Sequence, residues 1–318
     1  MKNKSESPPS LSAMKSRSRG EVLVVSICVC TYRRPHLLSL LLDSLAKQSF
    51  GDLFEVVVVD NDSTASAAHV VNAAKKSYVN LNIRYAVESQ KGISFARNTA
   101  ASLAAGHFLA WIDDDETAAE NWLMSLWTSQ CTSNADAVFG PVIPIFPQGS
   151  HSWPERSGIF DRPRHLTGTR INAGEARTGN AFVKAKWFQT VAPPFEPRFA
   201  NTGGEDYDFF ARIEDRGARF EWCDEAEVFE VVPFERQRLV WILERRLRTS
   251  TNYWRRRSAH KVRMTIRASI GGVACIVLGI AGIIVAPFGL HHAVRLWCRA
   301  MGGLGRALAI SGLRWRGY

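Results

Sequence analysis

The sequence predicts an α/β fold in which a mostly parallel sheet has helices on both faces, followed by a carboxyl-terminal membrane segment. Short Val/Ile-rich runs alternate with helical patterns through the first half of the chain, as in parallel sheets that are buried on both faces. Polar residues follow each of the first four runs. A later stretch of 23 residues, 268–290, contains no charged side chain. These three observations predict the sheet, its functional edge and the membrane segment.

The first half of the chain is predicted to contain four strand–helix pairs. The first helix shows its pattern clearly, because its leucines recur at the three- and four-residue spacing of one helix face. The Val/Ile-rich runs before each helix are typical of buried strands. The predicted strands cover residues 23–30, 54–59, 83–87 and 108–112, and the predicted helices cover 35–48, 63–78, 93–105 and 119–131.

The middle of the chain is less regular. Residues 141–177 contain five prolines, and we expect them to form a long loop over the functional site. A short strand is predicted at 181–183, and the prolines between 193 and 197 exclude a helix interior there. A helix at 207–216 and a strand-like run at 228–232 complete the predicted catalytic domain, residues 21–233.

The formal charge of +10 is unevenly distributed, and its distribution excludes nucleic acid as the expected partner. Residues 1–20, which we expect to be a disordered basic tail, carry +4, and residues 21–233 carry −8. Residues 234–318 hold sixteen Lys or Arg and two Glu, a net charge of +14. Because the positive charge lies beside the apolar segment, it indicates contact with anionic membrane lipids.

The apolar run at 268–290 is predicted to be a transmembrane or membrane-embedded helix. As a helix it spans roughly 35 Å, which is long enough to cross a bilayer. Pro287, near the end of this run, could kink the helix, so a re-entrant segment is an alternative to a full crossing. Residues 234–267 are expected to be a basic helical region beside the membrane, and 291–318 a basic amphipathic tail at its surface. Positive charge before the segment places the catalytic domain on the cytoplasmic side of the inner membrane.

The arginines of these flanking regions leave two interpretations open. Arg245, Arg246 and Arg248 occupy one predicted helix, where they bind a diphosphate or lipid phosphate, or else form a solvated or membrane-facing surface. Arg295 and Arg299 follow the apolar run, and a second membrane crossing would bury them. We therefore expect them to lie beside lipid phosphates.

The polar residues after the four strands are predicted to meet at one edge of the sheet, where ligands of such sheets bind. Asp113, Asp114 and Asp115 follow the fourth strand directly. An isolated acidic triplet is often only a solvated turn, but Mg²⁺ and Mn²⁺ bind through one or two carboxylates together with substrate phosphates. Four polar loops on one edge favour a metal–nucleotide site. The other polar residues follow the first strand (Thr31, Tyr32, Arg33), the second (Asp60, Asn61, Asp62, Ser63) and the third (Glu88, Lys91, Gly92).

Five motifs in this order and spacing resemble glycosyltransferase family 2, over about residues 22–230. The membrane segment and the Arg/Gly-rich end also resemble bacterial exopolysaccharide glycosyltransferases of the succinoglycan type. The resemblance implies a GT-A type sheet, a UDP-sugar donor, a divalent cation (Mn²⁺ or Mg²⁺) and inversion at the anomeric carbon. The motifs are Val25-Ser26-Ile27-Cys28-Val29-Cys30-Thr31-Tyr32-Arg33-Arg34-Pro35, Val59-Asp60-Asn61-Asp62-Ser63, Gly92-Ile93-Ser94-Phe95-Ala96-Arg97-Asn98, Trp111-Ile112-Asp113-Asp114-Asp115-Glu116 and Gly203-Gly204-Glu205-Asp206.

The resemblance also implies roles for individual residues that bind the donor. Asp60 would bind the uracil, while Thr31 and Arg33 would frame the nucleotide. Asp113 would contact the ribose, and Asp115 would ligate the metal that bridges the diphosphate. Two basic residues complete the predicted donor site: Lys91, after the third strand, and Arg97, which would support the base and its loop.

Inversion requires a base that deprotonates the acceptor hydroxyl, and Asp206 is the predicted base because it opens a helix facing the cleft. Glu205 is expected to be an acceptor-hydroxyl or structural partner, although the two roles could be exchanged. Both acids could instead serve only to stabilise the helix dipole.

The sequence thus predicts a membrane-attached enzyme that adds one hexose to a lipid-linked saccharide during bacterial surface-polysaccharide synthesis. The Gln-x-x-Arg-Trp motif of some processive enzymes is absent. The chain also has a single apolar span, which favours release of the product after one sugar is added over extrusion of a polymer. The prediction leaves room for association with other polysaccharide-assembly proteins. Two alternatives are a non-catalytic nucleotide-sugar-binding or scaffold subunit, and a nucleotidyltransferase, which would need a glycine-rich loop in place of Thr31–Pro35.

Overall fold

The computed structural model describes residues 23–51, 53–79, 81–256 and 261–309, with the side chains of 252, 255, 256 and 261–271 outside the description. The predicted tail at 1–20 and the end of the predicted surface tail, 310–318, therefore lie outside the described residues. The chain divides into two compact units. The first contains the chain up to Ile143 and Arg162–Glu230, and the second contains Pro144–Asp161 and the chain from Val231 onward.

The first unit is built on an eight-stranded, mostly parallel sheet, as predicted. Its strand order is β3-β2-β1-β4-β9-β6-β10-β8. The pairs β3/β2, β2/β1, β1/β4 and β6/β10 are parallel, whereas β9 and β8 run antiparallel to their neighbours. The strands are β1 (Val25–Thr31), β2 (Phe54–Asp60), β3 (Asn82–Val87), β4 (Phe108–Ile112), β6 (Ala137–Phe139), β8 (Arg170–Ile171), β9 (Asn180–Lys184) and β10 (Phe220–Trp222).

Strand register brings the predicted functional residues to one edge of this sheet. Thr31 at the end of β1 pairs with Asp60 at the end of β2, which in turn pairs with Val87 at the end of β3. On the other side of β1, Cys28 pairs with Trp111 of β4. The acidic triplet after Ile112 therefore lies next to the carboxyl end of β1.

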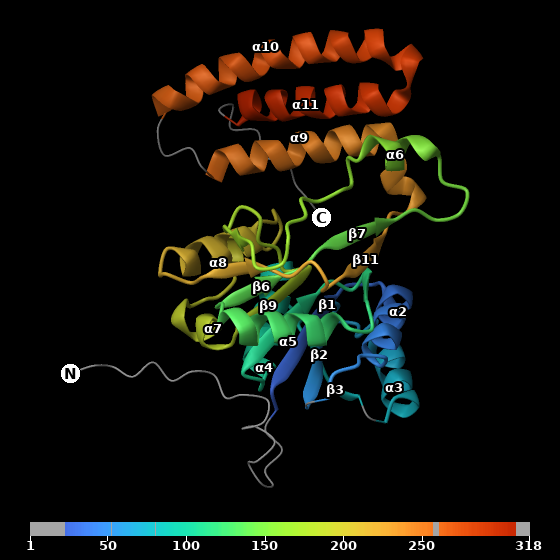
Figure 1. Ribbon diagram of the computed structural model, residues 1–318, viewed down its shortest axis with the longest axis vertical. Helices are drawn as coiled ribbons and strands as arrows, with labels where there is room; N and C mark the ends of the chain where they lie inside the picture. Colours follow the sequence, from blue (N-terminus) through green and yellow to red (C-terminus); the bar gives the residue numbers. More distant parts are fainter. Residues whose placement is uncertain (1–22, 52, 80, 257–260, 310–318) are drawn as a thin grey trace, which may run out of the picture. The chain divides into compact units, whose positions relative to one another are not determined.

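Helices cover both faces of the sheet, which confirms the prediction (Figure 1). Side chains of β1 alternate between the faces, so Ile27 and Val29 enter one core and Cys28 enters the other. The first core packs against α2 (Pro35–Leu45), α3 (Ala68–Ser77) and α5 (Trp122–Ser133), and the second against α4 (Ile93–Leu103), α7 (Lys186–Thr190) and α8 (Glu205–Glu214).

The prediction of a long loop at 141–177 is wrong in part, because this stretch contains two strands and a helix. It holds β7 (Val142–Ile145), α6 (Ser152–Ser157) and β8. Its prolines are compatible with these elements: Pro144 lies in an edge strand, where a missing N–H is tolerated, and Pro154 lies in the first turn of α6. Strand β7 belongs to a second, three-stranded sheet with β11 (Val228–Val231) and β5 (Glu116–Ala118), in the order β5-β11-β7.

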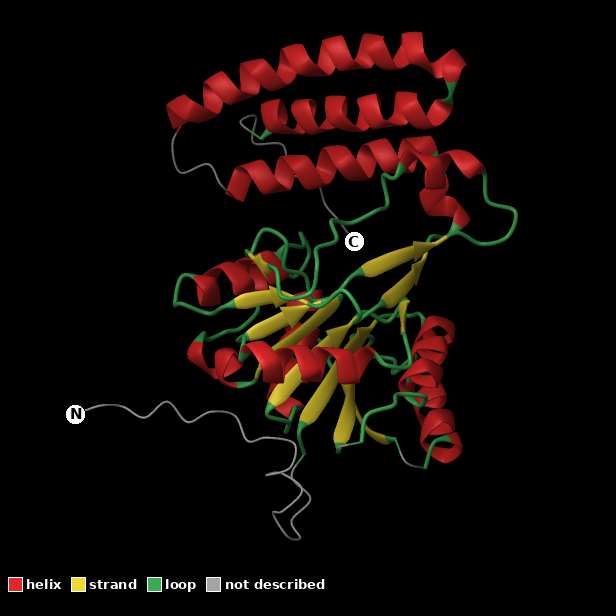
Figure 2. Ribbon diagram, viewed as in Figure 1, coloured by secondary structure: helices red, strands yellow, loops and turns green. Residues whose placement is uncertain are grey.

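The second unit contains three long helices, α9 (Leu239–Arg256), α10 (Lys261–Val285) and α11 (Leu290–Leu308). Helix α11 packs against both α10 and α9, and the three run side by side (Figure 2). The predicted membrane segment at 268–290 forms most of α10, the 3₁₀ turn Ala286–Phe288 and the start of α11. In the part of the chain that the structure describes, no helix has both the length and the apolar composition needed to cross a membrane.

Candidate active site

The three carboxylates after β4 differ in their surroundings. Asp114 is buried and accepts hydrogen bonds from the Thr31 hydroxyl at 2.7 Å and the Arg34 guanidinium at 3.3 Å. Burial raises the pKa of Asp114 to about 6. The same Arg34 nitrogen lies 3.3 Å from Asp115. Thr31, predicted to frame the nucleotide, is thus buried itself and joins the end of β1 to the triplet.

Asp113 and Asp115 are the more accessible members of the triplet. Their side chains are 44% and 17% exposed, against 7% for Asp114. Behind them, buried Glu116 accepts a hydrogen bond from the Asp113 backbone N–H at 2.9 Å. Burial and the nearby Asp113 raise the pKa of Glu116 well above its ordinary value. The end of β4 therefore combines a buried acidic layer with two carboxylates that can reach a ligand.

The exposed carboxylates suit a hard divalent cation. Within the described residues, no three His, Cys, Asp or Glu side chains are grouped as a complete metal site. A cation bound to a nucleotide diphosphate needs only one or two protein carboxylates, since phosphates and water supply its other ligands. Asp115 and Asp113 provide such oxygen ligands. Their surplus of negative charge is only partly balanced by Arg34 and Arg97.

An aromatic and basic surface follows β1 and β3. Two cations lie over the ring of Tyr32: the guanidinium of Arg33 is 5.1 Å from the ring centroid, and the ammonium of Lys91 is 5.4 Å from it. Arg33 also donates to Asp62 at 2.9 Å, which lowers the pKa of Asp62 to about 2. The side chain of Arg33 is 61% exposed. Arg33 and Lys91, both predicted as donor-binding residues, are therefore accessible to an anionic nucleotide.

Asp60, predicted to bind the uracil, is completely buried. Its carboxylate accepts hydrogen bonds from the backbone N–H groups of Asp62 (3.0 Å) and Ala67 (2.8 Å) and from the Tyr85 hydroxyl (2.9 Å). These bonds hold the loop after β2. Because no part of the Asp60 side chain is exposed, the uracil contact stays a prediction.

Asn61, which the sequence analysis placed at this edge without giving it a role, connects two of the loops there. Its amide donates to the carbonyls of Glu88 at 3.0 Å and Gln90 at 2.7 Å. Its side-chain oxygen accepts a hydrogen bond from the Gly92 N–H at 2.7 Å. Asn61 therefore fixes the loop that carries Lys91. Its position directly after β2 predicted its place at the edge, but its partners follow only from the folded loops.

Arg97 joins three elements of the site. It lies on α4 with its side chain 8% exposed, and it pairs with Glu205 at the start of α8 and with Asp113 at 3.3 Å. Burial alone would lower the Arg97 pKa, but Glu205, Asp113 and Asp206 raise it above its ordinary value. For Glu205, burial raises the pKa although Arg97 opposes this effect. The predicted support role of Arg97 thus has a concrete form, an ion pair that positions α8 against β4.

Asp206 differs from Glu205 in accessibility. Glu205 is 4% exposed and is engaged with Arg97, whereas Asp206 is half-buried and accepts a hydrogen bond from the Tyr207 N–H at 2.7 Å. The helix begins after Gly204, whose φ of +90° suits glycine. This turn leaves Asp206 in the first turn of α8, close enough to Arg97 to act on its charge.

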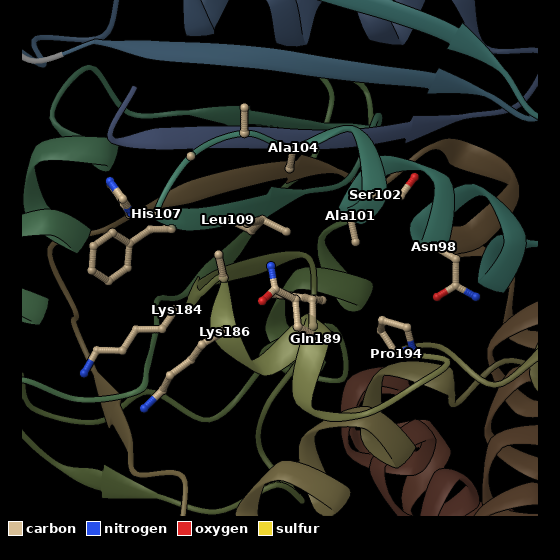
Figure 3. A pocket seen from close by; sticks show the side chains of 15 residues that line it. Asn98, Ala101, Ser102, Ala104, His107, Leu109, Lys184, Lys186, Gln189 and Pro194 are labelled. Atoms are coloured by element: carbon tan, nitrogen blue, oxygen red, sulfur yellow. The ribbon is translucent and has the colours of Figure 1, made fainter. Parts of the chain in front are cut away.

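A groove of about 730 Å³ lies at the opposite edge of the sheet, next to the start of β4, the end of α4 and α7 (Figure 3). Three of its polar side chains are engaged by other residues. Lys186 lies 3.0 Å from Asp136, and Lys184 donates to Asn134 at 2.8 Å. Asn98 exchanges two hydrogen bonds with the backbone of Phe195. The groove is separate from the candidate active site, because none of the predicted site residues lines it.

Comparison with known proteins identifies the family. A model of glycosyl transferase family 2 matches residues 26–191, just over half of the chain. The succinoglycan biosynthesis protein ExoM of Rhizobium meliloti is 33% identical over 274 residues, which cover 84% of this chain and 86% of ExoM. The chain belongs to glycosyltransferase family 2.

Solved structures with the same fold include one with bound UDP and one with bound GDP-Man and Mn²⁺. Staphylococcus aureus TarS (residues 1–349), solved with UDP, has a TM-score of 0.54 and 18% identity, covering 92% of this chain and 93% of TarS. The mannosyltransferase PcManGT of Pyrobaculum calidifontis, solved with GDP-Man and Mn²⁺, has a TM-score of 0.61 and 18% identity, covering 89% and 86%. These similarities establish the GT-A fold of this family 2 glycosyltransferase.

Proposed function

We propose that this glycosyltransferase moves one hexose from a UDP-sugar to a lipid-linked glycan acceptor, with inversion, during assembly of a bacterial surface polysaccharide. The observation that carries the proposal is the pairing of Arg97 with both Glu205 and Asp113. This pairing brings the first turn of α8, which contains Asp206, to the acidic edge where a donor would bind. Base and donor site thus belong to one connected network.

The donor would bind across the carboxyl ends of β1, β2 and β4. Arg33, Lys91 and the ring of Tyr32 offer cationic and aromatic contacts to a nucleotide, and Asp113 is exposed enough to accept hydrogen bonds from a ribose. The UDP in the TarS structure supports this class of donor, although PcManGT binds a GDP-sugar on the same fold.

Asp115, with Asp113 beside it, would hold the Mn²⁺ or Mg²⁺. When bound, the cation would stabilise the negative charge that develops on the leaving diphosphate. Arg34 lies between Asp114 and Asp115, and it would keep the Asp115 carboxylate oriented.

Asp206 would act as the general base. It would take the proton of the acceptor hydroxyl as that oxygen forms its bond to the anomeric carbon, while the bond from this carbon to the diphosphate oxygen breaks. Glu205 is a poor alternative, because it is buried and its carboxylate is held by Arg97. We assign Glu205 a positioning role. If it took a proton from the substrate, it would lose the negative charge that pairs with Arg97.

The lipid-linked acceptor and the attachment to the cytoplasmic face of the inner membrane are supported by the second unit. Residues 234–318 carry a net charge of +14, and α10 exposes a row of apolar side chains. The name of ExoM, a succinoglycan biosynthesis protein, supports a role in exopolysaccharide synthesis.

The test is release of nucleotide from UDP-glucose, UDP-galactose, UDP-N-acetylglucosamine or GDP-mannose, with Mn²⁺ or Mg²⁺, in the presence and absence of a membrane lipid extract. The proposal predicts metal-dependent release of UDP from one donor that increases when the extract is added. Release from GDP-mannose alone would contradict the donor assignment. Equal release without lipid, accompanied by transfer to a water-soluble glycan, would contradict the acceptor assignment.

A further inference from the structure

Helix α10 exposes one continuous apolar face. Its exposed side chains recur at spacings of three and four residues, so they lie on one side of the helix. Every one of them is more than half exposed, an unusual state for so many large aliphatic residues in one row. The row, here named the α10 stripe, consists of Val273, Ile276, Val277, Ile280, Ile283 and Ile284.

The opposite face of α10 is packed against α11. The indole N–H of Trp297 donates to the carbonyl of Gly279 at 3.2 Å. At Gly282 the indole lies so close that an added Cβ atom would be 2.2 Å from its nitrogen. Gly282 is nine residues from Val273, half a rotation from the stripe. The stripe is therefore the face that α10 does not use for packing against α11.

The charge around the stripe indicates what covers it. The first two turns of α10 contain Lys261, Arg263 and Arg267, whereas residues 268–290 contain no charge. Residues 234–318 carry +14 in total. A second copy of the chain would bring the same positive charge against this surface, whereas an anionic lipid surface combines acyl chains for the stripe with phosphates for the basic residues.

We propose that α10 lies in the plane of an anionic membrane surface, with the α10 stripe inserted between the lipids, as the means of attachment in the proposed function. The neighbouring helix supports this orientation over a crossing. Helix α11 runs along α10 and carries exposed Arg295 and Arg299, and a crossing of the pair would take both charges through hydrocarbon. Arg295 also donates to the carbonyls of Ser157 at 2.7 Å and Arg156 at 2.8 Å, which anchors α11 to polar backbone.

The first experiment measures binding of the full chain to vesicles of phosphatidylcholine with or without phosphatidylglycerol, by flotation. Wild-type protein should bind the anionic vesicles preferentially. The triple variant Ile276→Glu/Ile280→Glu/Ile283→Glu should bind at least about tenfold more weakly, since each change removes a large apolar group that would insert between the lipids. The matched control Val79→Glu/Leu166→Glu replaces two apolar side chains that are 87% and 83% exposed in the first unit, and it should bind like wild type.

Circular dichroism and UDP binding of each variant show that it is folded. Vesicle binding is measured without donor or acceptor, so loss of the proposed transfer reaction would leave this result unchanged. Wild-type binding by the triple variant would overturn the proposal. A dimer of the lipid-free wild type that the triple variant lacks, seen by light scattering, would instead assign the stripe to a second copy.

The second experiment distinguishes an in-plane helix from a crossing. A depth-sensitive fluorophore is attached in turn at Val273→Cys, Ile280→Cys and Ile284→Cys, in a chain whose six native cysteines are replaced by alanine and which retains vesicle binding. Lipids with quenchers at different depths then report each position. An in-plane helix gives one shallow depth for all three. A crossing would spread positions 273 and 284 over roughly 16 Å and overturn the proposal.

Discussion

Arg97 is the residue on which the candidate site depends most, because it joins helices that lie far apart in the sequence. Its partner Glu205 is 108 residues away, and both side chains are buried. A buried pair contributes little net stability, but removal of one partner leaves an uncompensated charge in the interior. Arg97 is therefore a positioning residue, and its loss would act on the placement of Asp206.

We predict that Arg97→Met lowers the free energy of unfolding by about 3–5 kcal/mol, because Glu205 then stays buried without its cation. The double variant Arg97→Met/Glu205→Met should recover most of this loss. Urea unfolding followed by circular dichroism measures both. A double variant no more stable than Arg97→Met would show that the pair is not the source of the effect.

Asp115 is the residue whose loss should change the metal requirement. We predict that Asp115→Asn raises the Mn²⁺ concentration needed for half-maximal UDP release by roughly 10- to 100-fold or more. Loss of a residue that only orients a metal ligand already weakens metal binding by this much, and Asp115 is proposed to be a ligand itself. Asp215→Asn, at an exposed position after α8, is the matched control. Identical metal curves for wild type and Asp115→Asn would rule out Asp115 as a ligand, and chelation by EDTA should abolish release in all three proteins.

At the scale of elements, helices and strands with strong periodicity were predicted closely, and local turn chemistry explains the differences. The helix predicted at 63–78 begins at Ala68, because the Asp62 carbonyl accepts a hydrogen bond from the Ala65 N–H and Ala65 has a φ of +54°. The strand predicted at 228–232 exists, but its partners β5 and β7 precede it by about a hundred residues, which no local pattern could reveal.

The contact between α10 and α11 gives a test at this scale. Gly282→Ala should lower the free energy of unfolding of the helical unit by about 1–3 kcal/mol, since its new methyl group would meet the Trp297 indole. Gly279→Ala is the matched control, because open space surrounds that position and alanine favours the helix. In thermal unfolding, the Tm of Gly282→Ala should be lower than that of wild type, and the Tm of Gly279→Ala should be higher. Equal Tm values for the two variants would mean that the Trp297 indole does not pack closely against Gly282.

At the scale of the whole molecule, the sequence predicted the edge at which the site lies but not the accessibility of its members. Parallel strands bring their carboxyl ends together, so Thr31, Asp60 and Asp113 could be placed near one another from their positions alone. Whether each faces the ligand depends on partners in distant loops. Asp60 is hidden by Tyr85 and Ala67, and Thr31 by Asp114, whereas the roles of Arg34 and Asn61 follow only from the folded loops.

The central claim is that Asp206, held in place through Glu205 and Arg97, is the base of an inverting sugar transfer. The most direct measurement is the turnover number for UDP release by Asp206→Asn at saturating donor and acceptor, with UDP affinity measured alongside and Asp215→Asn as control. We predict a fall of about 10²–10⁴-fold with unchanged UDP affinity. Near-normal turnover in Asp206→Asn, together with loss of turnover in a folded Glu205→Gln, would contradict the account and transfer the role of base to Glu205.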